Sequence, residues 1–556
     1  MLYKDSGDDF VSRVKSIETR ADQCLEHFAL LAIPTHISSW TILSATVHMI
    51  EDTHRRSGPD SSNFRGAMLN LARHAPLLIR WLGKNEMTSA ISGWIPQWDS
   101  LVGAQAFRDL RVVANYDAFR NSYPMWHRDR LSVELLGEGL VRFHTLAGSR
   151  GRQVSAFQKG FRRQSGVHQA IARARVVPTE AIVRRYKQLL DSAKPIGELG
   201  FHYEHSYELA NRTFHTYIQR LSGIMRRSEN LDLGPYTLGM FKRFYAALQT
   251  ICTIHEHLCF LWGESTGTYP IASAVLVKPR YEWNRLLSFH SGLTESNTKQ
   301  LLNDLTFYSK RLPDLHVFPL VPLDEQQEWL AVVPHFILNS SPEDNILRTC
   351  SYLRQSSYDR LSDDKAAVMR EDLLEKLKRF RCEHSIPLPD GSTEIDLLVE
   401  DIQSSTVVIA ELKWYRKPST YRERLRADAD FEDGYKRQLA TTKTYCRQHP
   451  NWLHNRNALG GPLSDYKNVF YLLIGRDHWS WFDPQDEAAV VEFEQFRLAI
   501  DRHTQLDEGV REVSKYDWLP IEDEDFHVQF DRGVVEGVGV ESEVYYGGPP
   551  NEPHKS

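Results

Sequence analysis

The stretch that most constrains the fold runs over residues 394–414, with the sequence EIDLLVEDIQSSTVVIAELKW. Two apolar runs rich in leucine and β-branched residues, 395–399 and 407–412, flank a short polar segment, and this pattern predicts a β-hairpin. A turn centred between residues 403 and 404 places Asp396 directly across from Glu411. Because strand side chains alternate between faces, Lys413 lies one pleat further along the Glu411 face, and Leu412 points to the other.

The predicted facing carboxylates suit a metal site better than they suit a purely structural sheet. Like charges directly opposite each other destabilise a sheet, and a buried carboxylate needs a hydrogen-bonded partner or a metal. Mg²⁺ prefers oxygen ligands and typically uses one or two carboxylates, water and substrate phosphates. The sequence therefore predicts a divalent-cation site formed by Asp396 and Glu411 beside the ammonium group of Lys413.

Asp396, fourteen residues, and then Glu411-Leu412-Lys413 resemble the D…(D/E)xK signature of the PD-(D/E)XK nuclease superfamily, which has the restriction-endonuclease-like fold. The surrounding pattern also matches that core over about residues 362–500, because a helix is expected over 364–381, another over 434–445, and a buried strand over 469–474. The sequence departs from the family pattern at two positions. It has Ile395 where the family pattern has a proline before the acid, and Thr442 where the Q-x-x-x-Y motif of some members has a tyrosine.

The resemblance implies a nuclease that hydrolyses phosphodiester bonds with Mg²⁺ or Mn²⁺, and we expect DNA rather than RNA as the substrate. Lys413 would orient or help deprotonate the attacking water, and Gln438 would position a phosphate or water. The implied metal ligands are Asp396, Glu411, the Leu412 carbonyl and Glu371 on the first helix, with Glu375 as the weaker helix candidate. Two alternatives stay open: a hairpin that carries only a salt bridge, since so short a motif also occurs by chance, and a non-catalytic nucleic-acid-binding module on the same fold.

Length and composition suggest two to four domains in a chain of 556 residues with a formal net charge of −6. The six cysteines contain no CxxC pair, which favours a reducing compartment over a disulfide scaffold. The first ten residues have no apolar signal core, and no apolar run approaches the length of a membrane span. We therefore expect a cytoplasmic protein without membrane contact.

The expected fold class is α+β and multidomain, with a mostly α-helical N-terminal region followed by a C-terminal restriction-endonuclease-like α/β domain with a mixed central sheet. A helix, a tight turn at Gly292 and a second helix over 281–308, followed by strands near 317–323 and 328–338, resemble a winged helix-turn-helix; those strands could equally extend the nuclease sheet. The last stretch has nine acids against two basic residues, which predicts a disordered tail. The expected domains are 1–270, 271–360, 361–520 and the tail 521–556.

A basic block over residues 150–187 holds ten Lys/Arg residues against one acid. Such a block can bind nucleic acid by neutralising phosphates, although a solvated loop would have the same composition. The residues predicted to contact nucleic acid are Arg150, Arg152, Lys159, Arg162, Arg163, Arg173 and Arg175. A nuclease domain joined to a large helical region suggests a host-defence (antiviral) or mobile-element effector, and a homodimer would suit double-strand cutting.

Two short patterns in the helical region offer other chemistry. Arg120 and His127 match the Rx4–6H pattern of the HEPN ribonucleases, and this region resembles those proteins in being helical. A site of that kind would cut RNA without metal. Pro124 inside the motif favours a break in the helix. Cys252, His255 and Cys259 share one helical face and could hold zinc, which would need a fourth ligand. Cysteine and histidine on a buried helix face more often belong to the core.

Overall fold

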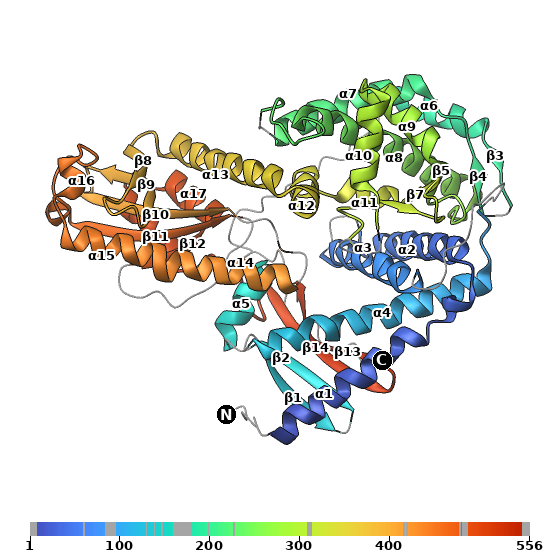
Figure 1. The fold of residues 1–556 in the computed structure, drawn as a ribbon, viewed down its shortest axis with the longest axis horizontal. Helices are drawn as coiled ribbons and strands as arrows, with labels where there is room; N and C mark the ends of the chain where they lie inside the picture. The colour runs from blue at the N-terminus through green and yellow to red at the C-terminus, as the bar shows by residue number, and fades with distance from the viewer. Residues whose placement is uncertain are drawn as a thin grey trace.

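The computed structural model describes residues 8–58, 62–83, 96–128, 131–137, 139–145, 148–158, 180–197, 199–225, 228–308, 314–414, 418, 421–476, 480 and 488–547. The chain forms an α+β structure with several separate sheets (Figure 1). No single described helix is long and apolar enough to cross a membrane, whereas one bent pair, Phe10–Ala32 with Thr35–Arg56, passes the same test of length and composition.

The N-terminal part consists of helices that pack on a four-stranded sheet. Its elements are α1 (Asp8–Asp22), α2 (Thr35–Ser57), α3 (Ser62–Leu82), α4 (Ser100–His127), β1 (Leu131–Gly137), β2 (Leu140–Thr145) and α5 (Gly148–Gln158). Two short 3-10 helices, Gln23–Glu26 and Ala29–Ala32, join α1 to α2. The region expected to be mostly α-helical thus also contains strands, because β1 and β2 form an antiparallel hairpin.

The C-terminal residues complete this N-terminal sheet. Strands β13 (Phe526–Val535) and β14 (Val538–Gly547) form a hairpin, and β14 pairs in parallel with β2, which gives the strand order β1-β2-β14-β13 (Figure 1). The predicted disorder of the acidic tail is therefore wrong for residues 526–547. Acidic side chains alternate with valines along β14, and the valines near the turn enter the core beneath α1 and α4.

The middle part contains helices around a small three-stranded sheet. Its elements are α6 (Glu180–Asp191), β3 (Lys194–Pro195), β4 (Phe201–His202), α7 (Tyr207–Ile224), α8 (Leu238–Thr266), β5 (Leu276–Pro279), α9 (Arg280–Ser291), α10 (Glu295–Leu305), β6 (Leu320–Pro322), β7 (Trp329–Val332), α11 (Pro334–Asn339) and α12 (Pro342–Leu353). The hairpin α9–α10 was expected: Gly292 ends α9 with φ +65° and Thr294 caps α10.

The sheet of the middle part, with the order β5-β7-β6, is separate from the five-stranded sheet of the C-terminal part, so its strands do not extend that sheet. One hydrophobic core joins α7 and α8 to α9, α10 and α12, and it continues across residue 270 without a break. Helix α10 carries a single basic residue, Lys299, against Glu295 and Asp304. The charge of this helix therefore gives no support to its insertion into a DNA groove.

The C-terminal part is a five-stranded mixed sheet between two layers of helices (Figure 1). Its elements are α13 (Gln355–Leu377), β8 (Arg381–Pro387), β9 (Glu394–Asp401), β10 (Thr406–Trp414), α14 (Tyr421–Asp433), the π-helix η3 (Gly434–Leu439), α15 (Ala440–Gln448), α16 (Trp452–Asn455), the 3-10 helix η4 (Leu463–Asp465), β11 (Asn468–Arg476), β12 (Ala488–Glu492), α17 (Phe493–Arg502) and α18 (Leu506–Ser514). The strand order is β12-β11-β10-β9-β8.

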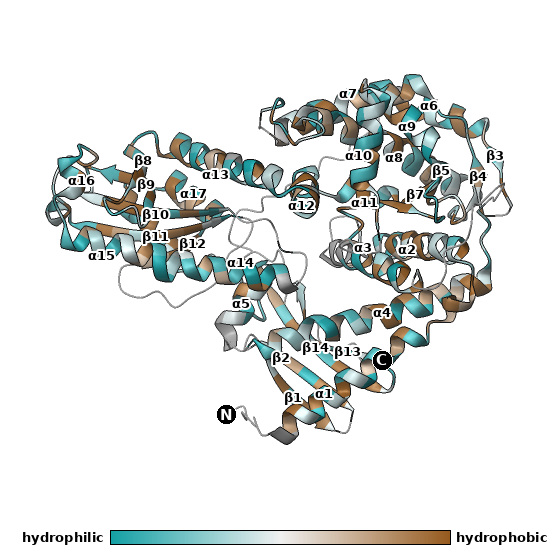
Figure 2. Ribbon diagram, viewed as in Figure 1, coloured by the Kyte–Doolittle hydropathy of each residue, from teal (hydrophilic) through white to brown (hydrophobic). Residues whose placement is uncertain are grey.

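Both faces of this sheet are buried, which explains its long apolar strands. One face packs against α13, α17 and α18, and the other against α14, η3 and α15. Apolar residues are concentrated in the strands, whereas α14 is mainly polar (Figure 2). Strands β8, β9 and β10 are antiparallel, while β10, β11 and β12 are parallel. The mixed central sheet of the predicted C-terminal domain is thus present.

Candidate functional site

The hairpin of β9 and β10 has the predicted register. Its ladder runs from Asp401 opposite Thr406 to Leu397 opposite Ala410. One further step places Asp396 opposite Glu411, and the alternation of the strand turns Lys413 to the same face. The side chains of Val407 and Ile409 on this face enter the core beneath η3. The carboxylates therefore lie at the end of an apolar strand face.

Asp396 and Glu411 are each in direct contact with a neighbouring residue of β10. The Leu412 amide N–H donates a hydrogen bond to Asp396 Oδ2 at 2.7 Å. The Lys413 ammonium lies 2.7 Å from Glu411 Oε1, and the Glu411 side chain is 6% exposed. Asp396, Glu411 and Lys413 therefore form one cluster, with the backbone of Leu412 between the acids.

Burial makes both carboxylates hard to ionise. Burial and, after it, the negative charge of Asp396 raise the pKa of Glu411 to about 7, against the opposing effect of Lys413. Burial also raises the pKa of Asp396, while the Leu412 amide and the charge of Lys413 act in the other direction. A strongly perturbed carboxylate with a specific charged neighbour is a common property of functional sites.

The π-helix η3 covers the ammonium end of the cluster. A Cβ atom on Gly434 would lie 2.9 Å from Lys413 Cε and 3.5 Å from Gln438 Oε1, so both side chains adjoin the first residue of this helix. Gln438 is half-buried. The predicted helix over 434–445 is present as η3 and α15, and its first residue, Gly434, adjoins both Gln438 and Lys413. A π-helical turn frequently marks a functional site.

The helix acid is not part of the cluster. Glu371 and Glu375 are both exposed, because α13 turns Met369, Leu373 and Leu377 toward the opposite face of the sheet. The residue of α13 whose charge acts on Asp396 is Arg370. Sequence reasoning also missed Glu394, whose charge raises the pKa of both Asp396 and Glu411. Its position two residues before Asp396 on one strand was the available signal.

The donor set fits a cation that needs few protein ligands. Within the described ranges, no three His, Cys, Asp or Glu side chains are grouped as a metal-binding set. Two carboxylates and a nearby carbonyl match Mg²⁺, which keeps several waters and uses substrate phosphates. They do not match a closed four-ligand zinc site. Asp396 and Glu411 could therefore hold Mg²⁺ or Mn²⁺ without Glu371.

The basic block is only partly within the described residues. Lys159, Arg162, Arg163, Arg173 and Arg175 lie outside them, as does the side chain of Arg150. Arg152 pairs with Glu522 at 3.0 Å and with Glu543 at 3.1 Å. This pairing joins α5 to the C-terminal hairpin, and the contact of Arg152 with nucleic acid stays a prediction.

The two alternative patterns of the helical half have structural partners. Helix α4 continues through Pro124, so the expected break is wrong. Arg120 and Asn121 both contact Asp117, at 3.8 Å and 2.9 Å, and the His127 ring packs on Tyr123. The buried His255 lies 3.1 Å from the Tyr203 hydroxyl and 2.6 Å from the Ser273 carbonyl. These contacts favour a core role for His255 over zinc binding.

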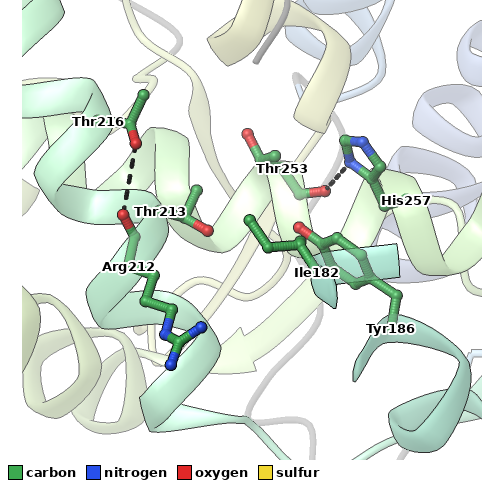
Figure 3. Close-up of a pocket in the computed structure, with 7 residues that line it drawn as sticks. All are labelled: Ile182, Tyr186, Arg212, Thr213, Thr216, Thr253 and His257. Carbon is green, nitrogen blue, oxygen red and sulfur yellow. Dashed lines mark hydrogen bonds between the residues drawn. The ribbon is translucent and has the colours of Figure 1, made fainter. Parts of the chain in front are cut away.

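A small pocket lies between α6, α7 and α8 (Figure 3). The Tyr186 ring stacks on His257 with centroids 5.0 Å apart, and His257 Nδ1 lies 2.8 Å from the Thr253 carbonyl. Arg212 is the charged residue at its edge, and no carboxylate lines it. This lining offers no acid and base pair or metal ligands, so the carboxylate cluster is the better candidate site.

Comparison with known proteins adds no assignment, because no family model, no curated protein and no solved structure matches the chain.

Proposed function

We propose that the protein is a metal-dependent nuclease that hydrolyses phosphodiester bonds of DNA at the cluster of Asp396, Glu411 and Lys413. The observation that carries the proposal is the convergence of a buried carboxylate, Glu411, a half-buried carboxylate, Asp396, and one ammonium at a single point of a mixed sheet. A purely structural sheet gains nothing from facing acids. The resemblance to the PD-(D/E)XK superfamily supports the same assignment through the same residues.

The roles follow from the position of each side chain. Asp396 and Glu411 would hold the ion, and a bound Mg²⁺ supplies polarisation of the phosphate and a more acidic water. The Lys413 ammonium, already beside Glu411, would orient the water and offset the charge that develops on the phosphate oxygens. Gln438 would hydrogen-bond the phosphate or the water from η3. The role in host defence, the cytoplasmic location and the homodimer belong to this proposal as its biological setting.

The test is cleavage of supercoiled plasmid with Mg²⁺ or Mn²⁺, with and without EDTA. Wild type is compared with Asp396→Ala and Lys413→Ala, and Glu432→Gln serves as a matched control because its side chain lies on α14 and pairs with Lys436. We expect metal-dependent cutting in wild type and in the control, with a loss of at least a hundredfold in both site variants. Equal cutting by all four proteins would contradict the proposal.

A parallel assay on RNA separates the metal site from the helical half. Cutting of RNA that survives EDTA and both site substitutions would move the chemistry to Arg120 and His127. Binding of DNA without cutting, under every metal tested, would favour the non-catalytic module on the same fold.

A further inference from the structure

A half-buried guanidinium lies at one side of the carboxylate cluster. Arg370 of α13 donates a hydrogen bond from Nη1 to Ser385 Oγ at 3.0 Å. The β8–β9 register pairs His384 with Leu397 and Ile386 with Ile395, so Ser385 stands opposite Asp396. Within the described part of the chain, Arg370 has no carboxylate at ion-pair distance. Most of its planar set of five donors is therefore open to a ligand.

The backbone at Ser385 is strained where this contact forms. Ser385 has φ +52°, a left-handed conformation that costs a residue other than glycine about 1–2 kcal/mol. Strain of this kind persists where the surrounding structure imposes it, and it is frequent at ligand-binding sites. Ser385 interrupts the β8 edge beside Asp396 and directs its hydroxyl to Arg370. The local structure thus fixes the guanidinium beside the acids.

A second guanidinium belongs to η3, in the helix layer on the face of the sheet opposite α13. Arg437 of η3 donates to both carboxylate oxygens of Asp433, at 2.8 Å and 2.7 Å. It precedes Gln438, and η3 begins over Lys413. The side chains of Arg437 and Asp433 are 60% and 48% exposed, and exposed pairs contribute little free energy. A phosphate could therefore replace Asp433 as the partner of Arg437 at small cost.

We propose that Arg370 and Arg437 bind the backbone phosphates on either side of the scissile bond, so that the substrate is an internal stretch of a polynucleotide strand. The inference rests on the proposed function, which places the scissile phosphate at Asp396 and Glu411. The planar guanidinium matches a phosphate with two parallel hydrogen bonds. An enzyme that removes terminal nucleotides finds phosphates on one side only, so two flanking sites indicate internal cleavage.

The charges around the site also favour binding of a polynucleotide through these two arginines. Two neighbouring carboxylates repel a polyanion, and the single ammonium of Lys413 offsets only one of those charges. The charge of Arg370 lowers the pKa of Asp396, and the pKa of Arg437 is raised by Asp433 and, more weakly, by Glu411. The two guanidiniums thus act on opposite members of the acid pair. Together they provide a cationic path across an otherwise acidic site.

The test measures binding of a duplex DNA oligonucleotide with Ca²⁺ in place of Mg²⁺, over a series of salt concentrations. Each phosphate contact contributes about 0.9 to the slope of log affinity against log salt concentration. We expect Arg370→Gln and Arg437→Gln each to make this negative slope shallower by about this amount, and the double variant to make it shallower by about twice as much. Glutamine at 370 keeps a donor for Ser385, which preserves the fold.

Matched controls come from the same two helices. Lys376→Gln on α13 removes a charge that pairs with Asp501 at 2.8 Å, and Lys436→Gln removes the neighbour of Arg437, which pairs with Glu432. Both control variants should keep the wild-type slope. Wild-type slopes in both arginine variants would overturn the inference, and so would a wild-type protein that does not bind the duplex.

The outcome is independent of catalysis. Metal-dependent plasmid cutting together with unchanged slopes refutes the phosphate contacts and leaves the proposed nuclease intact. Lowered slopes in a protein that cuts nothing support the contacts and refute the hydrolysis. In a protein that cuts, the product ends give a second reading: nicked circles and internal fragments support two flanking sites, and mononucleotides released from linear ends oppose them.

Discussion

Glu411 is expected to destabilise the metal-free protein when it ionises. Its pKa is about 7 in the folded chain and 4.5 ordinarily, so the folded chain holds the proton more tightly than the unfolded chain. The contribution of Glu411 to stability is therefore greatest below pH 4.5 and is lost as the pH rises through 7. At about 1.4 kcal/mol for each pH unit between the two values, the loss reaches about 3 kcal/mol near pH 8.

Glu411→Gln removes this cost because glutamine has the same shape and no charge. In EDTA, we expect the variant to exceed wild type in free energy of unfolding by about 3 kcal/mol at pH 8, and the advantage to fall by about 2–3 kcal/mol at pH 5. The measurement is chemical denaturation at both pH values. The same variant should lose metal-dependent cutting, because Glu411 is a proposed metal ligand. A gain in stability at the expense of activity is common for substitutions in active sites.

Mg²⁺ provides the second half of this test. A cation that binds the ionised pair in the folded protein alone should stabilise wild type at pH 8 and should leave Glu411→Gln nearly unchanged. Asp501→Asn, at an exposed carboxylate that pairs with Lys376, controls for a general effect of removing an acid. A stability difference between wild type and Glu411→Gln that is equal at pH 5 and pH 8 would refute the reasoning.

Three further substitutions test the site and its support. Gly434→Ala should place a new Cβ 2.9 Å from Lys413 Cε and so displace that side chain. The cleavage rate should fall about tenfold, while the free energy of unfolding changes by less than about 1 kcal/mol. Arg152→Ala should lower the free energy of unfolding by roughly 2–3 kcal/mol in denaturant, because Glu543 is 5% exposed and, among the described residues, keeps only the hydroxyls of Thr145 and Tyr545 after it loses its cationic partner. Gly537→Ala, in a turn with φ +72°, should cost about 1–2 kcal/mol in the same assay.

The acid pair was predictable because it depends on local rules. A short turn and strict alternation along two strands determine which residues face each other, and they placed Asp396 opposite Glu411 from the sequence alone. Lys413 followed from the same alternation. The sequence did not show which residue of α13 lies near the acid pair. A helical wheel orders Glu371 by its angle to the apolar face, but it does not show which face of the sheet α13 covers.

The surroundings of the acids depend on contacts far apart in the sequence. Helical periodicity predicted a helix around Gln438, whereas the π-helical turn that brings Gly434 against Lys413 arises only when that helix packs on the sheet. Ser385 appears in the sequence as an ordinary strand residue, and its left-handed conformation becomes evident only beside Arg370. Such departures from local preference are expected at sites that carry function.

The C-terminal stretch shows how composition can outweigh a stronger signal. Nine acids over residues 521–556 predicted disorder, yet alternation on both sides of Glu536-Gly537 is typical of a hairpin with a two-residue turn. Both turn residues have positive φ, 47° and 72°, as such a turn requires. Net charge opposes folding only when apolar side chains cannot be buried, and here Val535, Val538 and Val540 are within a core.

The same hairpin changes the boundaries of the folding units. Strand β14 lies between β2 and β13, so it is the inner strand that joins the N-terminal and C-terminal halves of the sheet. A boundary at residue 520 would remove β13 and β14 with their buried valines, leave one edge of β2 without a neighbouring strand, and expose the core beneath α1 and α4. It would also strip Arg152 of Glu543. The C-terminal part with the five-stranded sheet is therefore enclosed in sequence by one unit whose strands come from both ends of the chain. Helix α5, which contains the first residues of the basic block, is fixed to that unit through Glu522 and Glu543.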